Sequence, residues 1–282
     1  MEIRSRAASW DDWLAIKILV QSATQTMPCL WHWEDHLAAG EVVVAEQGDV
    51  LVGALLACSD DSPVAWVRLA VVDSGISTAQ WLRCLLPRTL EALRRQNVSE
   101  LAWMDYGGWV GPHLAQWGFD RLTDVVTLVK LDRDLPSVRA NARVRAVRQE
   151  DIPRVAEIDR AAFPPTWWNS ETTLHYRRTH SSHFAVAEVH GRVVGFAEGE
   201  VSMPTAHLNR LAVDPAHQSQ GIGALLLNHM VLAFWRAGAN EITLNTQRDN
   251  ASSLRLYHGF GFEPEGAQVT VWRYALAAPR EG

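Results

Sequence analysis

The sequence predicts a mixed α/β protein (an α+β fold with a mixed sheet) made of two tandem domains of the same kind. In each domain we expect a central, mostly antiparallel sheet flanked by helices. The chain has 282 residues, whereas one domain usually takes about 100–200 residues. The order of predicted elements also repeats, and a polar segment separates the two copies. These observations together favour a duplication.

The repeated landmarks keep a constant spacing. The stretches VVVAEQGDVLVGALLA and FAVAEVHGRVVGFAEG both predict hairpins that turn at Gly-Asp or at a glycine. Gly53 and Gly195 are 142 residues apart, as are Arg68 and Arg210, and the later QWGF and GFGF segments are 143 residues apart. This period is too long for a solenoid repeat, so it indicates two copies of one domain.

The segment DRDLPSVRANAR between the copies is polar, contains a proline and has no apolar periodicity. Such composition is typical of a linker. The predicted domains are therefore residues 1–132 and 143–282, joined by a linker at 133–142.

Composition excludes several classes of protein. A net charge of −6 argues against a nucleic-acid binder or a protein of anionic membranes, because both need basic surface. We find no apolar run of 18 residues and no signal-peptide core, so neither a membrane span nor secretion is expected. Cys29, Cys58 and Cys84 form no CxxC pair, which favours reduced thiols, a cytoplasmic location and no metal site.

The second copy contains a strand, a glycine-bearing loop and a helix in succession. LNRLAV predicts a strand that Asp214 and Pro215 stop, QSQGIG follows, and an apolar helical stripe then runs to Gly238. A helix N-terminus offers unpaired amides and the positive end of the helix dipole, which together bind anions. Neither a P-loop nor a GxGxxG fingerprint is present, and a purely structural turn is the alternative.

A second motif lies downstream. In NASSLRLYHGFGF, Asn250 is placed to cap a helix that carries Tyr257 and ends at Gly259 and Gly261. With this motif the chain resembles the GNAT superfamily of N-acetyltransferases over about 143–276. Its Q/R-x-x-G-x-G/A motif is matched by Gln218, Gly221 and Gly223, and its N-x-x-A-x-x-x-Y-x-x-x-G-F motif by Asn250 and Tyr257, with Ser253 in place of alanine. The stretch from Glu157 to Trp168 looks closest to ribosomal-protein alanine acetyltransferases.

The resemblance implies an acetyl-CoA-dependent N-acetyltransferase whose acceptor is a primary amine of a small molecule or peptide. It also implies that the LAV strand diverges from the next strand and that pantetheine lies alongside. The residues implied for coenzyme binding are Leu211, Ala212, Val213, Gln218, Ser219, Gln220, Gly221, Ile222, Gly223, Ala224, Asn250 and Ser253.

Tyr257 matches the family's general acid, and a packed core aromatic is the alternative. For the base, many N-terminal acetyltransferases use a glutamate where this chain has Asn245, which cannot take a proton. His207 is the better candidate, because it lies eleven residues before Gln218, where similar acetyltransferases carry a glutamate or a histidine as base, and because an imidazole titrates near neutral pH. A histidine that merely ends the strand is the alternative.

The acceptor side is less well marked. Glu198 and Glu200 alternate on the neighbouring strand and could act on the amine through a water, or could only face solvent. Trp167 and Trp168 lie in FPPTWW, where the family's acceptor loop usually lies, and aromatics bind apolar and cationic groups. We predict these four residues as substrate-binding.

The first copy lacks both motifs. Its corresponding stretch, DSGISTAQWLRC, has one glycine and a bulky tryptophan, and DYGGWVGPHLAQWGF lacks the asparagine and tyrosine. We therefore expect a degenerate domain with a structural role. A non-catalytic acyl-CoA sensor with a protein partner is the alternative to an enzyme, and a thiol-release assay over a panel of amines would separate the two.

Overall fold

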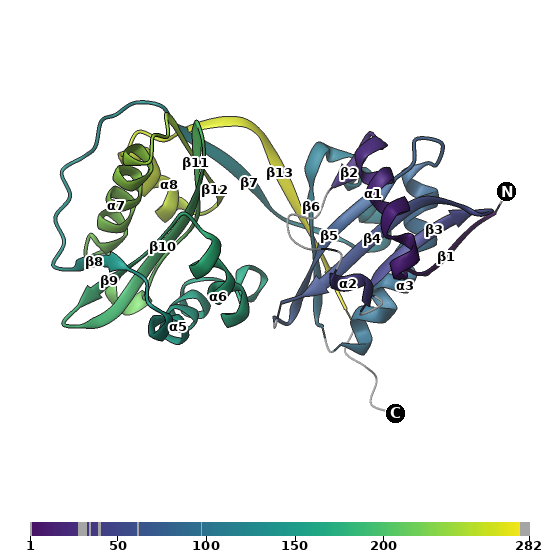
Figure 1. Ribbon diagram of the computed structural model, residues 1–282, viewed down its shortest axis with the longest axis horizontal. Helices are drawn as coiled ribbons and strands as arrows, with labels where there is room; N and C mark the ends of the chain where they lie inside the picture. The colour runs from purple at the N-terminus through teal and green to yellow at the C-terminus, as the bar shows by residue number, and fades with distance from the viewer. Residues whose placement is uncertain are drawn as a thin grey trace. The chain divides into compact units, whose positions relative to one another are not determined.

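The computed structural model describes residues 2–27, 33, 35–38, 41–60, 62–96 and 98–276; Cys29 lies outside them. The chain divides into two compact units, one formed by Met1–Leu122 with Val269–Gly282 and the other by Thr123–Gln268 (Figure 1). Each contains a mixed sheet with helices, as the predicted fold class requires.

The N-terminal unit has a sheet of strand order β1-β3-β4-β5-β6-β13, with β2 paired to β5. Its strands are β1 (Ile3–Ala7), β2 (Gln25–Met27), β3 (Val42–Gln47), β4 (Val50–Ser59), β5 (Val64–Val72), β6 (Glu100–Asp105) and the end of β13 (Glu263–Ala275). Its helices are α1 (Trp13–Ser22), α2 (Asp35–Ala38), α3 (Thr78–Arg95) and α4 (Gly111–Leu114).

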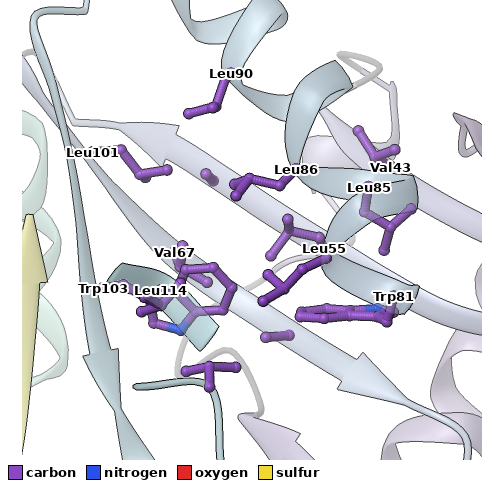
Figure 2. Packing of buried hydrophobic residues seen from close by; sticks show 14 of the residues in the cluster. Val43, Leu55, Val67, Trp81, Leu85, Leu86, Leu90, Leu101, Trp103 and Leu114 are labelled. Carbon is purple, nitrogen blue, oxygen red and sulfur yellow. The ribbon is translucent and has the colours of Figure 1, made fainter. Parts of the chain in front are cut away.

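Alternation along the strands supplies two cores in this unit. Val43 and Leu55 point to α3, whose Leu85, Leu86 and Leu90 bury one face of the sheet (Figure 2). The next residues along those strands pack against α1 on the opposite face. On the α3 side, the rings of Trp81 and Trp103 meet edge to face with centroids 6.1 Å apart.

The C-terminal unit has strand order β7-β12-β11-β10-β9-β8. These strands are β7 (Asp120–Lys130), β8 (Arg143–Ala146), β9 (His183–Val189), β10 (Arg192–Ser202), β11 (Thr205–Val213) and β12 (Glu241–Gln247). Its helices are α5 (Ile152–Ala162), α6 (Glu171–His180), α7 (Ile222–Arg236) and α8 (Ala251–Gly259). Buried residues of α5 and α6 share one core, and those of α7 and α8 share the other.

The two units exchange their last strands. The predicted contiguous domains, 1–132 and 143–282, do not include such an exchange. Residues 125–130 of β7 pair with β12 in the C-terminal unit, and residues 270–275 of β13 pair with β6 in the N-terminal unit. The segment 133–142, which the sequence predicts as a linker, forms no helix or strand. However, the units divide at Leu122 and Gln268, because each unit's sheet is completed by a strand from the other half of the sequence.

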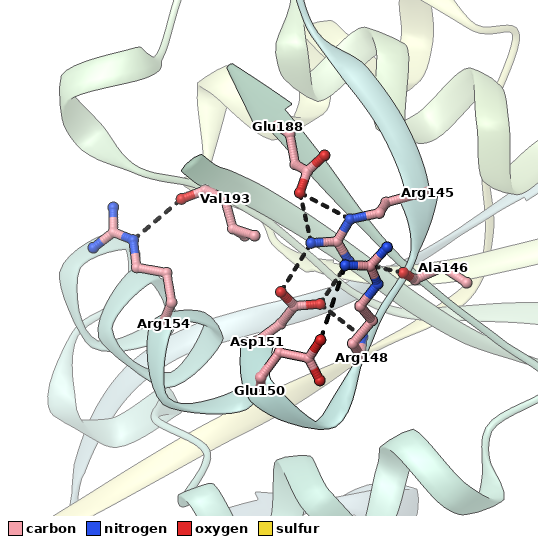
Figure 3. A network of polar contacts seen from close by, with 8 residues as sticks. All are labelled: Arg145, Ala146, Arg148, Glu150, Asp151, Arg154, Glu188 and Val193. Atoms are coloured by element: carbon pink, nitrogen blue, oxygen red, sulfur yellow. Dashed lines mark hydrogen bonds and ion pairs between the residues drawn. The ribbon is translucent and has the colours of Figure 1, made fainter. Parts of the chain in front are cut away.

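An ion-pair network ties β8 of the C-terminal unit to β9 and to the turn before α5. Arg145 donates to both carboxylate oxygens of Asp151, at 2.6 and 2.9 Å, and its Nε donates to Glu188 at 2.8 Å (Figure 3). A further bond of 3.0 Å reaches the carbonyl of Ala146. All three side chains are largely buried, so the network orients the turn and with it α5.

The N-terminal unit repeats this network. Arg6 donates to both oxygens of Asp12 at 2.7 Å, its Nε donates to Glu46 at 2.9 Å, and a bond of 3.1 Å reaches the carbonyl of Ala7. Three equivalent partner residues, met by the same donor nitrogens, support a common origin of the two units.

Candidate active site

The strands β11 and β12 run parallel and stop pairing midway. Their register covers residues 205–208 of β11 against 241–244 of β12. Beyond it, β11 continues to Val213 on β10 alone, and β12 continues on β7. The remaining edge of β11, residues 209–213, therefore presents backbone donors and acceptors that pair with no strand of the described residues on that side. This is the divergence that the resemblance predicts.

Helix α7 begins directly beyond this edge without a side-chain cap. Its N-cap is Gly221, and its first backbone bond runs from the Leu225 amide to the Gly221 carbonyl at 2.9 Å. The amides of residues 222–224 therefore have no acceptor inside the helix, and they point out of its N-terminus. An anion at that point would meet these donors and the positive end of the helix dipole.

Gly221 and Gly223 in the loop differ in whether the surrounding protein leaves room for a side chain. Gly221 has φ +79°, and an added Cβ would lie 2.5 Å from the carbonyl oxygen of Arg139, so a side chain is excluded there. At Gly223 an added Cβ would make only ordinary contacts, the nearest being Leu256 at 3.6 Å. The protein itself therefore does not require glycine at Gly223, although a larger side chain there would crowd the helix N-terminus.

The loop is tied to the strand that precedes it. Gln218 Nε2 donates to the carbonyl of Val213 at 3.1 Å, so the Gln218 side chain fastens the loop, and this carbonyl is already engaged. Asp214 accepts from the Ala216 amide at 3.0 Å and from the Arg154 guanidinium. Ser219 and Gln220 are exposed. Ala212 and Ile222 are buried, which leaves only their backbone groups for a ligand.

Helix α8 brings Asn250 and Tyr257 to this part of the unit. As predicted, Asn250 is the N-cap, since its side chain accepts from the Ser253 amide at 3.1 Å. Tyr257 is buried, and burial raises its pKa to about 12 while the charge of Arg210 opposes that rise. The phenol is therefore protonated at neutral pH, as an acid must be.

His207 lies against the Thr243 hydroxyl. Its Nδ1 is 2.8 Å from that oxygen, which is itself 3.3 Å from the Ala206 carbonyl. A hydroxyl that donates to the carbonyl places the ring proton on Nδ1 and the lone pair on Nε2, whereas a hydroxyl that donates to Nδ1 places the ring proton on Nε2. Burial lowers the pKa of His207, and the nearby Glu198 partly offsets this. His207 is the third residue of β11 rather than a strand-end residue, and its neutral form can accept a proton.

The two glutamates differ. Glu198 is buried, so the alternative that it only faces solvent is wrong, and its carboxylate accepts from Arg177, Ser181 and Asn209. Three donors leave this carboxylate poorly placed to take a proton. Glu200 pairs across the strands with His207 in register and makes only a longer contact of 3.4 Å with Asn209. Glu200 is therefore the more available carboxylate beside His207.

Sequence reasoning missed Arg210. Its guanidinium forms two bonds of 2.8 Å with Asp159 of α5 and one of 2.5 Å with the carbonyl of Trp167, and it stacks 3.6 Å from the Phe163 ring centroid. Within the FPPTWW loop, Trp168 donates its indole N–H to the Phe163 carbonyl at 2.8 Å. A charged residue inside the apolar LNRLAV strand was the signal that could have marked it.

The side chain of Asn245, which stands where many N-terminal acetyltransferases have a glutamate base, contacts a neighbouring strand. It lies on β12 just past the last residue paired with β11, and its Oδ1 accepts from the Thr127 hydroxyl of β7 at 2.9 Å. An amide at this place holds its neighbour but cannot act as a base.

The corresponding strand edge in the N-terminal unit is filled. There β5 pairs with β6 only at residues 64–66, and β2 pairs with β5 at residues 70–72 through Met27, Thr26 and Gln25. The short β2 therefore takes the edge that β11 leaves open. The sequence did not reveal this difference between the two units.

The helix N-terminus is also closed in the N-terminal unit. Ser77 caps α3 by accepting from the Gln80 amide at 3.3 Å, and Gln80 Oε1 accepts from the Ser77 amide at 3.3 Å. This reciprocal capping satisfies donors that α7 leaves unpaired.

In the described part of the chain, no helix is long and apolar enough to cross a membrane. Among the same residues, no group of His, Cys, Asp or Glu is arranged to hold a metal ion.

Comparison with known proteins gives a consistent result. The model of the acetyltransferase (GNAT) family matches residues 152–262. A putative ribosomal protein bS18 alanine N-acetyltransferase of Bacillus subtilis is 26% identical over 135 residues, which are 48% of this chain and 89% of that protein. An uncharacterized N-acetyltransferase of Methanocaldococcus jannaschii is 31% identical over 120 residues, 42% of this chain and 76% of that protein.

The whole chain resembles a solved two-domain protein. A tandem GNAT protein from the clavulanic acid biosynthesis pathway aligns with a TM-score of 0.65 over 98% of this chain and 99% of that one, at 18% identity. At this identity the likeness shows the fold alone, and it agrees with a tandem arrangement.

Proposed function

Because the chain belongs to the GNAT family of N-acetyltransferases, we propose that its C-terminal unit transfers the acetyl group of acetyl-CoA to a primary amine. The observation that carries this proposal is the open edge of β11, which leads to the uncapped N-terminus of α7. The edge of β11 supplies hydrogen bonds in the pattern of a strand, and the N-terminus of α7 supplies amides for a diphosphate.

The coenzyme would be held mainly by the backbone. Pantetheine would bond along residues 209–213 of β11, where the Val213 carbonyl already accepts one hydrogen bond from Gln218. The amides of residues 219–224 would bind the diphosphate, and the Asn250 side-chain amide, whose oxygen caps α8, would reach the pantetheine arm with its N–H donors.

The proton transfers follow from the two titratable side chains. A primary amine must lose a proton to attack the thioester, and Nε2 of His207 would accept it in the tautomer that carries the ring proton on Nδ1. The departing thiolate needs a proton, which the Tyr257 phenol supplies, because its raised pKa keeps it protonated. Attack is direct, so no acyl-enzyme forms.

The acceptor would lie over the polar side of β10 and β11. Glu200, opposite His207, offers a carboxylate to an incoming ammonium group, and the Arg210 contacts hold the loop with Trp167 and Trp168. The relatives named for acetylating an alanine of a ribosomal protein support a peptide amine as one acceptor class. A small-molecule primary amine meets the same chemistry.

Two measurements on the full chain test the proposal. Titration calorimetry with acetyl-CoA should show one site per chain, since β2 and the Ser77 cap close the N-terminal unit. A thiol-release assay over a panel of peptide and small primary amines should then show turnover. Absence of acetyl-CoA binding contradicts the proposal, and binding without turnover over the whole panel supports the acyl-CoA sensor instead.

A further inference from the structure

The N-terminal unit contains a thiol, an imidazole and a carboxylate in one line. His36 of α2 places Nε2 3.7 Å from Sγ of Cys58 on β4, and its Nδ1 lies 2.5 Å from Oε2 of Glu41. The other oxygen of Glu41 accepts from Gln96 Nε2 at 3.2 Å. Each member of the line is therefore positioned by the next.

The line determines which nitrogen carries the proton. The Glu41 carboxylate can only accept, so Nδ1 of His36 is the N–H donor to it. Nε2 then has the lone pair and faces the Cys58 thiol, which can pass its proton to the ring. The resulting imidazolium would lie between a thiolate and a carboxylate, and this pairing activates a cysteine nucleophile.

The sequence places this thiol where the C-terminal unit has a functional candidate. Cys58 lies five residues after Gly53 on β4, and Glu200 lies five residues after Gly195 on β10. Cys58 itself is 7% exposed, whereas the side chains of His36 and Glu41 are 31% and 21% exposed. The sulfur is therefore largely covered, whereas the imidazole and the carboxylate keep partial contact with solvent.

We propose that Cys58 is a base-activated thiol that a small peroxide oxidises to a sulfenic acid, with His36 as the base and Glu41 as the group that orients it. His36 takes the thiol proton, and the sulfur attacks one oxygen of hydrogen peroxide. The O–O bond breaks, and the leaving hydroxide takes the proton from His36 as water. The sulfur loses two electrons, which the peroxide gains.

Cys84 is a control within the same unit. It is more exposed than Cys58, and burial nonetheless raises its pKa without any histidine in contact among the described interactions. Exposure alone would thus make Cys84 the faster thiol. The proposed base reverses this order.

The test exposes the full chain to limiting hydrogen peroxide, traps sulfenic acid with dimedone and quantifies the label on each cysteine by peptide mass spectrometry. We expect Cys58 to be labelled about tenfold faster than Cys84. His36→Gln and Glu41→Gln should slow labelling of Cys58 by about tenfold, with Cys84 unchanged. Faster labelling of Cys84 in the wild type overturns the proposal even if the variants do not fold, and so does unaltered Cys58 labelling in folded variants. None of these readouts depends on acetyl transfer.

Discussion

Arg210 and Asp159 form a two-bond ion pair in which both nitrogen–oxygen distances are 2.8 Å and the carboxylate is fully buried. The pair joins β11 to α5, and the same guanidinium holds the loop of Trp167. The loop that we assign to the acceptor is therefore fastened to the strand that we assign to the coenzyme. A buried charge that loses its partner is costly, so this pair gives the first prediction.

Asp159→Asn should destabilise the C-terminal unit by about 3–5 kcal/mol, because Arg210 would remain buried without its counter-charge. Thermal and urea unfolding measure this loss. The control is Glu91→Gln in the exposed pair with Arg95, which should cost less than about 0.5 kcal/mol. Equal effects of the two substitutions would show that the buried pair has no special weight.

Tyr257→Phe should lower kcat by about 100-fold while the Kd for acetyl-CoA changes little, because only the acid is removed. The ring remains to pack edge to face with Phe262, at a centroid distance of 6.0 Å. Steady-state kinetics and calorimetry measure the two constants. An unchanged kcat would remove Tyr257 from the mechanism.

The acid limb of the pH profile should belong to His207. Its pKa is lowered in the folded protein, so the base is neutral above pH 6.5 and becomes protonated only below it. We therefore expect kcat/KM to be level from about pH 7 upward and to fall at pH values below about 6.5. Because the pKa of Tyr257 is raised to about 12, its ionisation should not lower kcat/KM below about pH 11.

Glu198→Gln provides the control for that profile. Its charge raises the pKa of His207, so its removal should move the acid limb to still lower pH. His207→Gln should remove the limb and lower kcat/KM by about 100-fold. A limb that keeps its position in His207→Gln would assign it to another group.

The two glycines of the loop should separate binding from folding. Gly223→Val should weaken acetyl-CoA binding by about tenfold or more with little change in Tm, because the added Cβ meets only ordinary contacts while the side chain crowds the phosphate amides. Gly221→Ala should lower stability by about 1–2 kcal/mol, because φ is +79° and the Arg139 carbonyl blocks the Cβ. Calorimetry and thermal unfolding distinguish these outcomes, and a loss of Tm in Gly223→Val would contradict the assignment.

Local patterns in the sequence predicted much of the fold. The hairpin turns at Gly48 and Gly191, the cap of α8 by Asn250 and the end of α7 before Gly238 are all present, because each depends on residues close together in the chain. The strand exchange of β7 and β13 was not predicted. Either strand could complete either sheet by its alternating pattern, and the choice is made by pairing across long sequence separations.

The sequence by itself determined the duplication, the family and the order of strand, loop and helix around Gly221, because these follow from spacing and local backbone preference. Only the tertiary structure decided that β2 closes the strand edge in one unit, and that Arg210 joins Asp159 to the Trp167 loop. It also placed Nδ1 of His207 against the Thr243 hydroxyl. The reason is physical: a hydrogen bond between distant segments depends on where the packed core brings their atoms, and periodicity along the chain carries no record of it.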